Sequence, residues 1–164
     1  MAPVAVSIGS NLDRERNVKE ALAALAKIFG KLLHSPVYES AAYGFDGPPF
    51  YNLVVIFETW LNAHVVRGKI QAIENQQGRE IGEHRSGSRS LDLDLLLYDG
   101  VVFHDQGLDV PRREIFEHAY ILKPLADLLP AMPHPVTGES FADIWLRLGS
   151  YQETLSVVDG FDLD

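Results

Sequence analysis

The most regular hydrophobic pattern in the chain lies between residues 91 and 98. Leucine occupies positions 91, 93, 95 and 97, and this period of two predicts a strand with one buried face. Asp92 and Asp94 stand between the leucines, so they share the opposite face, roughly 6.6 Å apart along the strand. Both carboxylates can therefore reach one small site.

Similar patterns predict the other elements. Strands are expected at residues 3–8 and 51–60, an extended segment at 31–40, and amphipathic helices at 13–29 and 63–77. Asp99-Gly100 predicts a tight hairpin that returns residues 101–103 beside the strand at 91–98. Helices follow at 112–116, 119–129 and 140–148. The order β-α-β-β-α-β predicts an α+β, ferredoxin-like sandwich, an antiparallel sheet with helices on one face, followed by an added hairpin strand and C-terminal helices.

Composition limits the class of protein. We expect a single domain over residues 1–150 and a loose acidic tail over 151–164. The absence of cysteine excludes a disulfide framework and a thiolate site. The net charge of −9 argues against a nucleic-acid binder, and no apolar run predicts a signal peptide or a membrane span. We expect a cytoplasmic monomer with small-molecule partners; an oligomer is the alternative.

Candidate chemistry gathers around the two aspartates. Their mutual repulsion is relieved by a divalent cation, and hard oxygen ligands suit magnesium. Arg85 and Arg89 flank Ser86-Gly87-Ser88 just upstream, and arginine forks grip phosphate oxygens. A polyphosphate site is one interpretation; a solvated acidic strand face after a basic loop is the other. Residues 41–50, rich in Gly, Pro and aromatics, form either a binding flap or an ordinary connection.

Four motifs occur in order: Ile8-Gly9-Ser10-Asn11-Leu12, Phe50-Tyr51-Asn52, Glu74-Asn75-Gln76-Gln77-Gly78-Arg79 and Arg89-Ser90-Leu91-Asp92-Leu93-Asp94. On these motifs the chain resembles the 6-hydroxymethyl-7,8-dihydropterin pyrophosphokinases of the folate pathway, over residues 3 to 145. The resemblance implies a ferredoxin-like fold. It also implies transfer of the terminal diphosphate of ATP to the pterin hydroxymethyl oxygen, release of AMP, and two Mg²⁺ ions as cofactors.

The resemblance also implies roles for individual residues. Asp92 and Asp94 match the ligands that bridge both metal ions. The positions that match an ATP site are Gln71, Glu74, Arg79, Arg89, Leu95, Arg112 and Arg113. The resemblance also implies that Arg79, Arg89 and the loop arginine Arg85 are catalytic together with the two aspartates. The positions that match a pterin site are Ser40, Ala41, Tyr43, Phe50, Asn52 and Tyr120. Taken singly, each has a structural alternative: Asn52 as a turn cap, Tyr120 as a core aromatic, Gln71 and Glu74 as a solvated helix face.

The chain also departs from the family pattern. Ser86 and Ser88 stand where a tryptophan and a proline are common, and Ile81 replaces a second loop arginine. Arg112 and Arg113 replace a histidine and an aromatic residue, and His118 replaces an arginine of the ATP site. These changes define a second hypothesis, a ferredoxin-like pterin-binding or regulatory module without catalysis.

Overall fold

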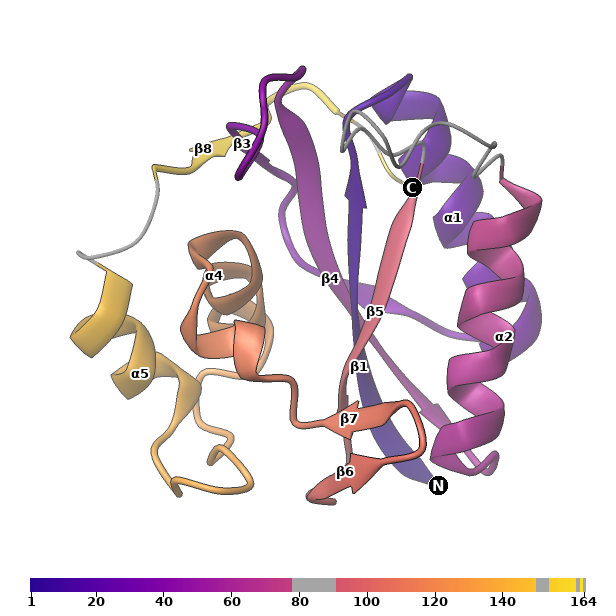
Figure 1. Cartoon of the computed structure of the whole chain (residues 1–164), viewed down its shortest axis with the longest axis vertical. Coiled ribbons are helices and arrows are strands. Elements are labelled where there is room, and N and C mark those ends of the chain that lie inside the picture. Colours follow the sequence, from indigo (N-terminus) through magenta and orange to yellow (C-terminus); the bar gives the residue numbers. More distant parts are fainter. Residues whose placement is uncertain (78–90, 150–153, 162, 164) are drawn as a thin grey trace.

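The computed structural model describes residues 1–77, 91–149, 154–161 and 163 (Figure 1). Its first half contains β1 (Ala2–Ser10), α1 (Arg14–Phe29), β2 (Leu33–His34), β3 (Tyr38–Ser40), β4 (Phe50–Thr59) and α2 (Ala63–Gln76). Its second half contains β5 (Asp92–Tyr98), β6 (Phe103–Asp105), β7 (Leu108–Val110), the 3-10 helix η1 (Arg113–Phe116), α4 (Ala119–Leu128), α5 (Phe141–Leu148) and β8 (Ser156–Val157). No helix within these ranges is long and apolar enough to cross a membrane.

The main sheet has the strand order β5-β1-β4-β3-β8, and β2 also pairs with β4. Every pairing is antiparallel. The α+β prediction is confirmed, and β4, whose middle is apolar, is the central strand. The extended segment predicted at 31–40 is divided between β2 and β3. Ser35 lies between the two strands: its backbone N–H donates to the carbonyl of Val54, and its Oγ accepts the N–H of Val54. Pro36 has no N–H with which to continue the hydrogen-bond ladder.

Helices cover both faces of the sheet, whereas the sequence predicted them on one face. Figure 1 shows α1 and α2 on one side and α4 and α5 on the other. Val4, Val6 and Ile8 of β1 belong to the core under α1 and α2, and Ala5 belongs to the core under α4 and α5. The sheet is apolar on both faces, so the C-terminal helices cover the second face. The prediction of helices on a single face did not include this second layer.

A β-bulge changes the predicted face of one leucine. The register of β1 against β5 shifts between Ala5 and Val6, which leaves Leu96 as the extra residue. Leu93 and Leu95 therefore pack under α1 and α2, whereas Leu97 packs with Leu96 in the opposite core. The alternation predicted from residue 91 holds only as far as residue 95.

The prediction of a hairpin at Asp99-Gly100 is wrong. Asp99 has a φ of 53° and a turn does form there, but residues 101–102 are in no strand. The hairpin forms instead between β6 and β7, where Gln106 and Gly107 have φ values of 53° and 77°. Two successive residues with positive φ match the twist of a two-residue hairpin loop, so the later Gln-Gly pair makes the hairpin.

The chain end contributes to the sheet, although it was expected to be a loose tail. β8 pairs with β3, and the N–H of Val158 donates to the carbonyl of Val37 at 2.9 Å. The ring of Phe161 lies 5.6 Å from that of Tyr51, centroid to centroid. These contacts attach residues 156–161 to the sheet, at edge strand β3 and at Tyr51 of β4.

Candidate active site

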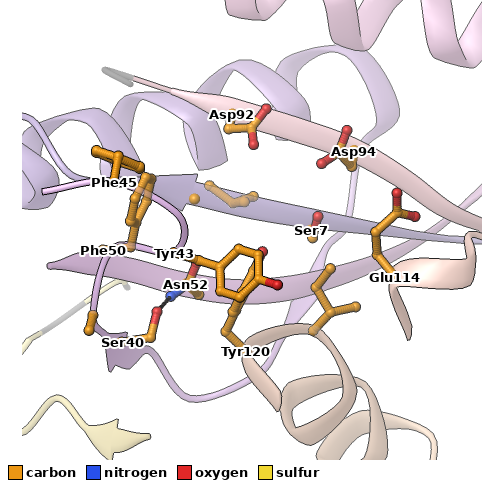
Figure 2. Close-up of a pocket in the computed structure, with 14 residues that line it drawn as sticks. Ser7, Ser40, Tyr43, Phe45, Phe50, Asn52, Asp92, Asp94, Glu114 and Tyr120 are labelled. Atoms are coloured by element: carbon orange, nitrogen blue, oxygen red, sulfur yellow. Dashed lines mark hydrogen bonds between the residues drawn. The ribbon is translucent and has the colours of Figure 1, made fainter. Parts of the chain in front are cut away.

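The two aspartates of β5 project from one face of the sheet. Asp92 lies opposite Gly9 of β1, and Asp94 lies opposite Ser7. Both side chains are half-buried, and Figure 2 shows their carboxylates directed over the same cavity. The face is the one that α4 and α5 cover elsewhere, so the site occupies the part of the sheet that these helices leave open.

An aromatic cavity of about 150 Å³ opens on one side of the aspartates. The predicted pterin residues all line it: Ser40, Ala41, Tyr43, Phe50, Asn52 and Tyr120. These six come from β3, β4, α4 and the loop at 41–49, so only the tertiary fold brings them together. Ser7, Gly9, Phe45 and Glu114 also line this cavity and were not predicted.

Asn52 and Ser40 form the polar inner end of the aromatic cavity (Figure 2). The Asn52 Nδ2 atom donates to Ser40 Oγ at 2.7 Å, and both residues are buried. Asn52 lies inside β4 and caps no turn. It pairs with Gly9 across the sheet, and a Cβ at position 9 would lie 3.3 Å from Asn52 Oδ1. Glycine therefore leaves room for the amide and for a ligand beside it.

Aromatic rings form the walls of the cavity. Tyr120, the second residue of α4, stacks on His118 with a centroid distance of 4.7 Å and an interplanar angle of 23°. Tyr43 contacts His118 in a T-shaped arrangement, with a centroid distance of 4.7 Å. His118, which the resemblance associated with the ATP site, thus supports two tyrosines of the aromatic cavity. Tyr43 is 69% exposed, so it stands at the rim.

The loop at 41–49 is attached to the start of α1. The Asn11 Nδ2 atom donates to the carbonyl of Pro48 at 3.2 Å. Arg14 Nη1 donates to the carbonyl of Pro49 at 3.1 Å. The motif at residues 8–12 therefore positions this loop, which explains its place beside the aromatic cavity.

A second, polar cavity of about 230 Å³ also borders the aspartates. Among the predicted ATP-site residues, Gln71, Glu74, Leu95 and Arg112 line it together with Asp92 and Asp94. Arg67 and Asp109 line it as well and were not predicted. The carboxylate pair is thus shared by an aromatic cavity and a polar one.

Glu74 has a structural contact that its place on α2 did not reveal. It is only 6% exposed, and its Oε2 accepts the backbone N–H of Leu93 at 2.7 Å. The carboxylate satisfies an edge N–H of β5, the strand that carries both aspartates. Gln71, one turn earlier, is exposed. The solvated-face alternative therefore fits Gln71 but does not describe Glu74.

Arg112 lies between the carboxylates of Asp94 and Glu114 and contacts both. Its Nη1 lies 3.7 Å from Asp94 Oδ1, and its Nε and Nη2 each lie 3.3 Å from a Glu114 oxygen. Burial lowers the pKa of the guanidinium, but the negative charges of Asp94, Glu114 and Asp109 outweigh burial and raise the pKa above its ordinary value. Arg112 therefore stays cationic beside the polar cavity.

The remaining predicted arginines are not placed in the site. Arg113 is 82% exposed at its side chain, pairs with Glu117 at 3.5 Å and borders neither cavity. Arg79, Arg85 and Arg89 lie outside the described residues, as do Ser86, Ser88 and Ile81. Their roles stay predictions.

The donor chemistry of the aspartates fits a magnesium site completed by a substrate. Within the described ranges, no group of three or more His, Cys, Asp or Glu side chains could hold a metal ion. Magnesium is commonly held by one or two protein carboxylates, with substrate phosphates and waters as the other ligands. Asp92 and Asp94 fit that incomplete set, and the polar cavity beside them offers space for phosphates.

Known proteins match this chain in sequence and in fold. The model of the 7,8-dihydro-6-hydroxymethylpterin-pyrophosphokinase (HPPK) family matches residues 5–130. A mitochondrial folate synthesis bifunctional protein of Pisum sativum is 38% identical over 159 residues, which are 89% of this chain and 31% of that protein. The folic acid synthesis protein fol1 of Pneumocystis carinii is 34% identical over 150 residues, 88% of this chain and 20% of that protein.

A solved structure shows the same fold at low identity. The wild-type HPPK-DHPS of Plasmodium falciparum has a TM-score of 0.70 at 14% identity, and the match covers 91% of this chain and 45% of that one. The chain spans from a fifth to a third of the two curated relatives named above. The family match extends over most of the main sheet, both cavities and the two aspartates, so the chain belongs to the 7,8-dihydro-6-hydroxymethylpterin-pyrophosphokinase family.

Proposed function

We propose that this chain transfers the diphosphate of ATP to the hydroxymethyl group of 6-hydroxymethyl-7,8-dihydropterin and releases AMP. The observation that carries the proposal is the position of Asp92 and Asp94 between an aromatic cavity and a polar one. A transfer between a flat heteroaromatic alcohol and a nucleotide needs both substrates to meet at one charged centre. The carboxylate pair is that centre.

The aspartates would hold two Mg²⁺ ions. When bound, such ions neutralise phosphate charge and polarise the phosphorus that is attacked. Asp92 and Asp94 contribute anionic oxygens on one sheet face, and Glu74 fixes their strand through the Leu93 N–H. The protein thereby orients the carboxylates before substrates arrive.

The aromatic cavity suits the pterin. Tyr120, already stacked on His118, offers a face to the ring. The Asn52–Ser40 pair offers an amide and a hydroxyl to the polar ring edge. In the polar cavity, Arg112 would bind phosphate oxygens, with Gln71, Glu74 and Leu95 beside the nucleotide. Arg79, Arg89 and Arg113 remain further ATP-site predictions from the sequence, and Arg85 remains a predicted catalytic arginine.

The test is AMP formation from ATP, Mg²⁺ and 6-hydroxymethyl-7,8-dihydropterin. Asp94→Asn keeps the shape of the side chain but removes its charge, and we expect turnover to fall by at least about 100-fold, the usual cost of losing a preorganised charge in a catalytic site. Asp105→Asn is the matched control, because Asp105 is exposed on β6 and borders neither cavity. Near-normal turnover by Asp94→Asn would remove the metal assignment.

Pterin binding without any AMP would favour the alternative, a binding or regulatory module. The cellular location is a separate question. The name of the pea relative places that protein in mitochondria, so a cytoplasmic location for this chain stays a prediction.

A further inference from the structure

Glu114 is the one carboxylate among the described cavity-lining residues that borders the aromatic cavity alone. Asp92 and Asp94 line both cavities, Glu74 and Asp109 line the polar one, and Glu114 lines only the aromatic one. We propose that Glu114 is a catalytic residue that accepts a hydrogen bond from the hydroxyl group of the pterin alcohol and receives its proton during the transfer. This inference rests on the function proposed above.

The position of Glu114 in the cavity supports this role. Figure 2 shows Asn52 and Ser40 at one end, Glu114 beside Asp94 at the other, and Tyr120 between them. A flat ring that lies against Tyr120 with its polar edge toward Asn52 directs its opposite edge toward the carboxylates. A hydroxymethyl group on that edge reaches the end of the cavity where Glu114 lies.

Arg112 fixes the direction of the Glu114 carboxylate. Two contacts of 3.3 Å join them, one from Nε and one from Nη2. An ionised carboxylate offers about four lone-pair sites, so two contacts with Arg112 leave acceptor capacity for a substrate hydroxyl. Because Arg112 also lies 3.7 Å from Asp94, the same guanidinium sets the spacing between Glu114 and the aspartate pair.

The two kinds of carboxylate have different surroundings. Asp92 and Asp94 face the polar cavity, where phosphates and cations would occupy their oxygens. Glu114 is absent from that cavity, and it completes no group of three metal-ligating side chains within the described part of the chain. Glu114 is therefore placed to act on the alcohol.

The step can be written in full. The hydroxymethyl oxygen uses a lone pair to form a bond with the β-phosphorus of ATP. The bond from that phosphorus to the oxygen shared with the α-phosphorus breaks, and AMP leaves with the electron pair. The proton of the hydroxyl group passes to Glu114. In protein kinases, the carboxylate of a catalytic aspartate likewise accepts the proton of the substrate hydroxyl group.

The experiment combines turnover with binding. Glu114→Gln keeps the size of the side chain, and we expect it to lower kcat for AMP formation by about 100-fold, the lower end for loss of an acid–base group. Glu117→Gln is the matched control, because Glu117 is exposed on the same segment and lines neither cavity. We expect that control to keep its kcat within twofold of the wild type, about the effect of a surface change.

A binding measurement tests the role of Glu114 independently of the proposed catalytic function. Calorimetry compares 6-hydroxymethyl-7,8-dihydropterin with its 6-methyl analogue, which lacks the hydroxyl group. The wild type should prefer the hydroxymethyl compound by about tenfold, as expected for one hydrogen bond to a charged acceptor. Glu114→Ala should lose that preference while binding of the methyl analogue is unchanged.

Each outcome decides between explanations. If the wild type forms no AMP, the proposed function fails, and the binding comparison alone decides whether Glu114 contacts the hydroxyl group. If Glu114→Ala keeps the preference, or Glu114→Gln keeps its kcat, the role of Glu114 is refuted. If added Mg²⁺ restores the activity of Glu114→Gln, the residue acts through Arg112 and Asp94, and the direct role is also refuted. Thermal melting of both variants checks that they are folded.

Discussion

Replacing Gly9 with alanine should impair pterin binding while leaving the fold almost unchanged. Gly9 lies in β1 between Asp92 on one neighbouring strand and Asn52 on the other. It lines the aromatic cavity, and its φ is not positive, so alanine fits the backbone conformation. The added methyl group is the whole perturbation.

The expected magnitudes follow from the surroundings of that methyl group. It would lie 3.3 Å from Asn52 Oδ1 and 3.8 Å from a Phe50 ring carbon, so the amide has to move by a few tenths of an ångström. The 2.7 Å hydrogen bond from Asn52 to Ser40 resists that movement, and weakening it costs up to about 1 kcal/mol. Alanine in a strand returns about 0.5–1 kcal/mol of backbone entropy. The two effects offset each other, so the free energy of unfolding changes by less than about 0.5 kcal/mol.

Pterin binding has no such compensation. A displaced amide loses its alignment with the pterin edge, and the Kd should rise about tenfold, which is about 1.4 kcal/mol. Titration calorimetry with 6-hydroxymethyl-7,8-dihydropterin measures the Kd, and urea unfolding measures stability. Gly68→Ala on α2 is the control, because a Cβ there meets nothing within 4 Å. It should leave the Kd unchanged and stabilise the fold by up to about 1 kcal/mol. A Gly9→Ala protein that binds the pterin as the wild type does would refute the reasoning.

Three further predictions concern stability and are measured by urea unfolding. Glu74→Ala should cost about 1.5–3 kcal/mol, because it removes a charged acceptor from the buried N–H of Leu93; a cost below about 0.5 kcal/mol would contradict this account. Burial lowers the pKa of His134, whose Nδ1 accepts two backbone N–H groups. The unfolded chain therefore binds more protons, and stability should fall as the pH drops below about 6.5, by at most about 1.4 kcal/mol per pH unit. His134→Asn should remove the contribution of His134 to the slope of unfolding free energy against pH. An equal slope in the variant and the wild type would disprove this role of His134. Phe161→Ala should cost about 1–2 kcal/mol through lost packing on Tyr51, whereas a loose tail would show no change.

The sequence by itself determined most of the elements and the composition of the site. Alternating leucines identified β5 and placed Asp92 and Asp94 on one face, because side-chain direction in a strand depends only on position along the chain. The ordered motifs identified the family resemblance, and that resemblance named six residues that the structure brings to one aromatic cavity. Their chemical roles remain proposals, but their gathering could be anticipated from sequence.

Tertiary structure decided the features that depend on a partner strand or helix. The bulge opposite β1 moved Leu97 to the other face, and a pattern read along one strand contains no information about its neighbour's register. Both faces of the sheet are apolar, yet which helices cover the second face is a matter of packing. β8 joins the sheet edge through backbone hydrogen bonds, which have little sequence signature.

The division of carboxylates in the site was also a tertiary result. Asp94, Glu74 and Glu114 come from three elements. The sequence assigned Asp94 to the metal ions and Glu74 to the ATP site, and it gave Glu114 no role. Folding buries Glu74 under the Leu93 N–H, sets Asp94 between two cavities and turns Glu114 toward one. Sequence specifies which ionisable groups exist, but their chemistry depends on burial, neighbouring charge and direction, and these arise only when distant segments pack together.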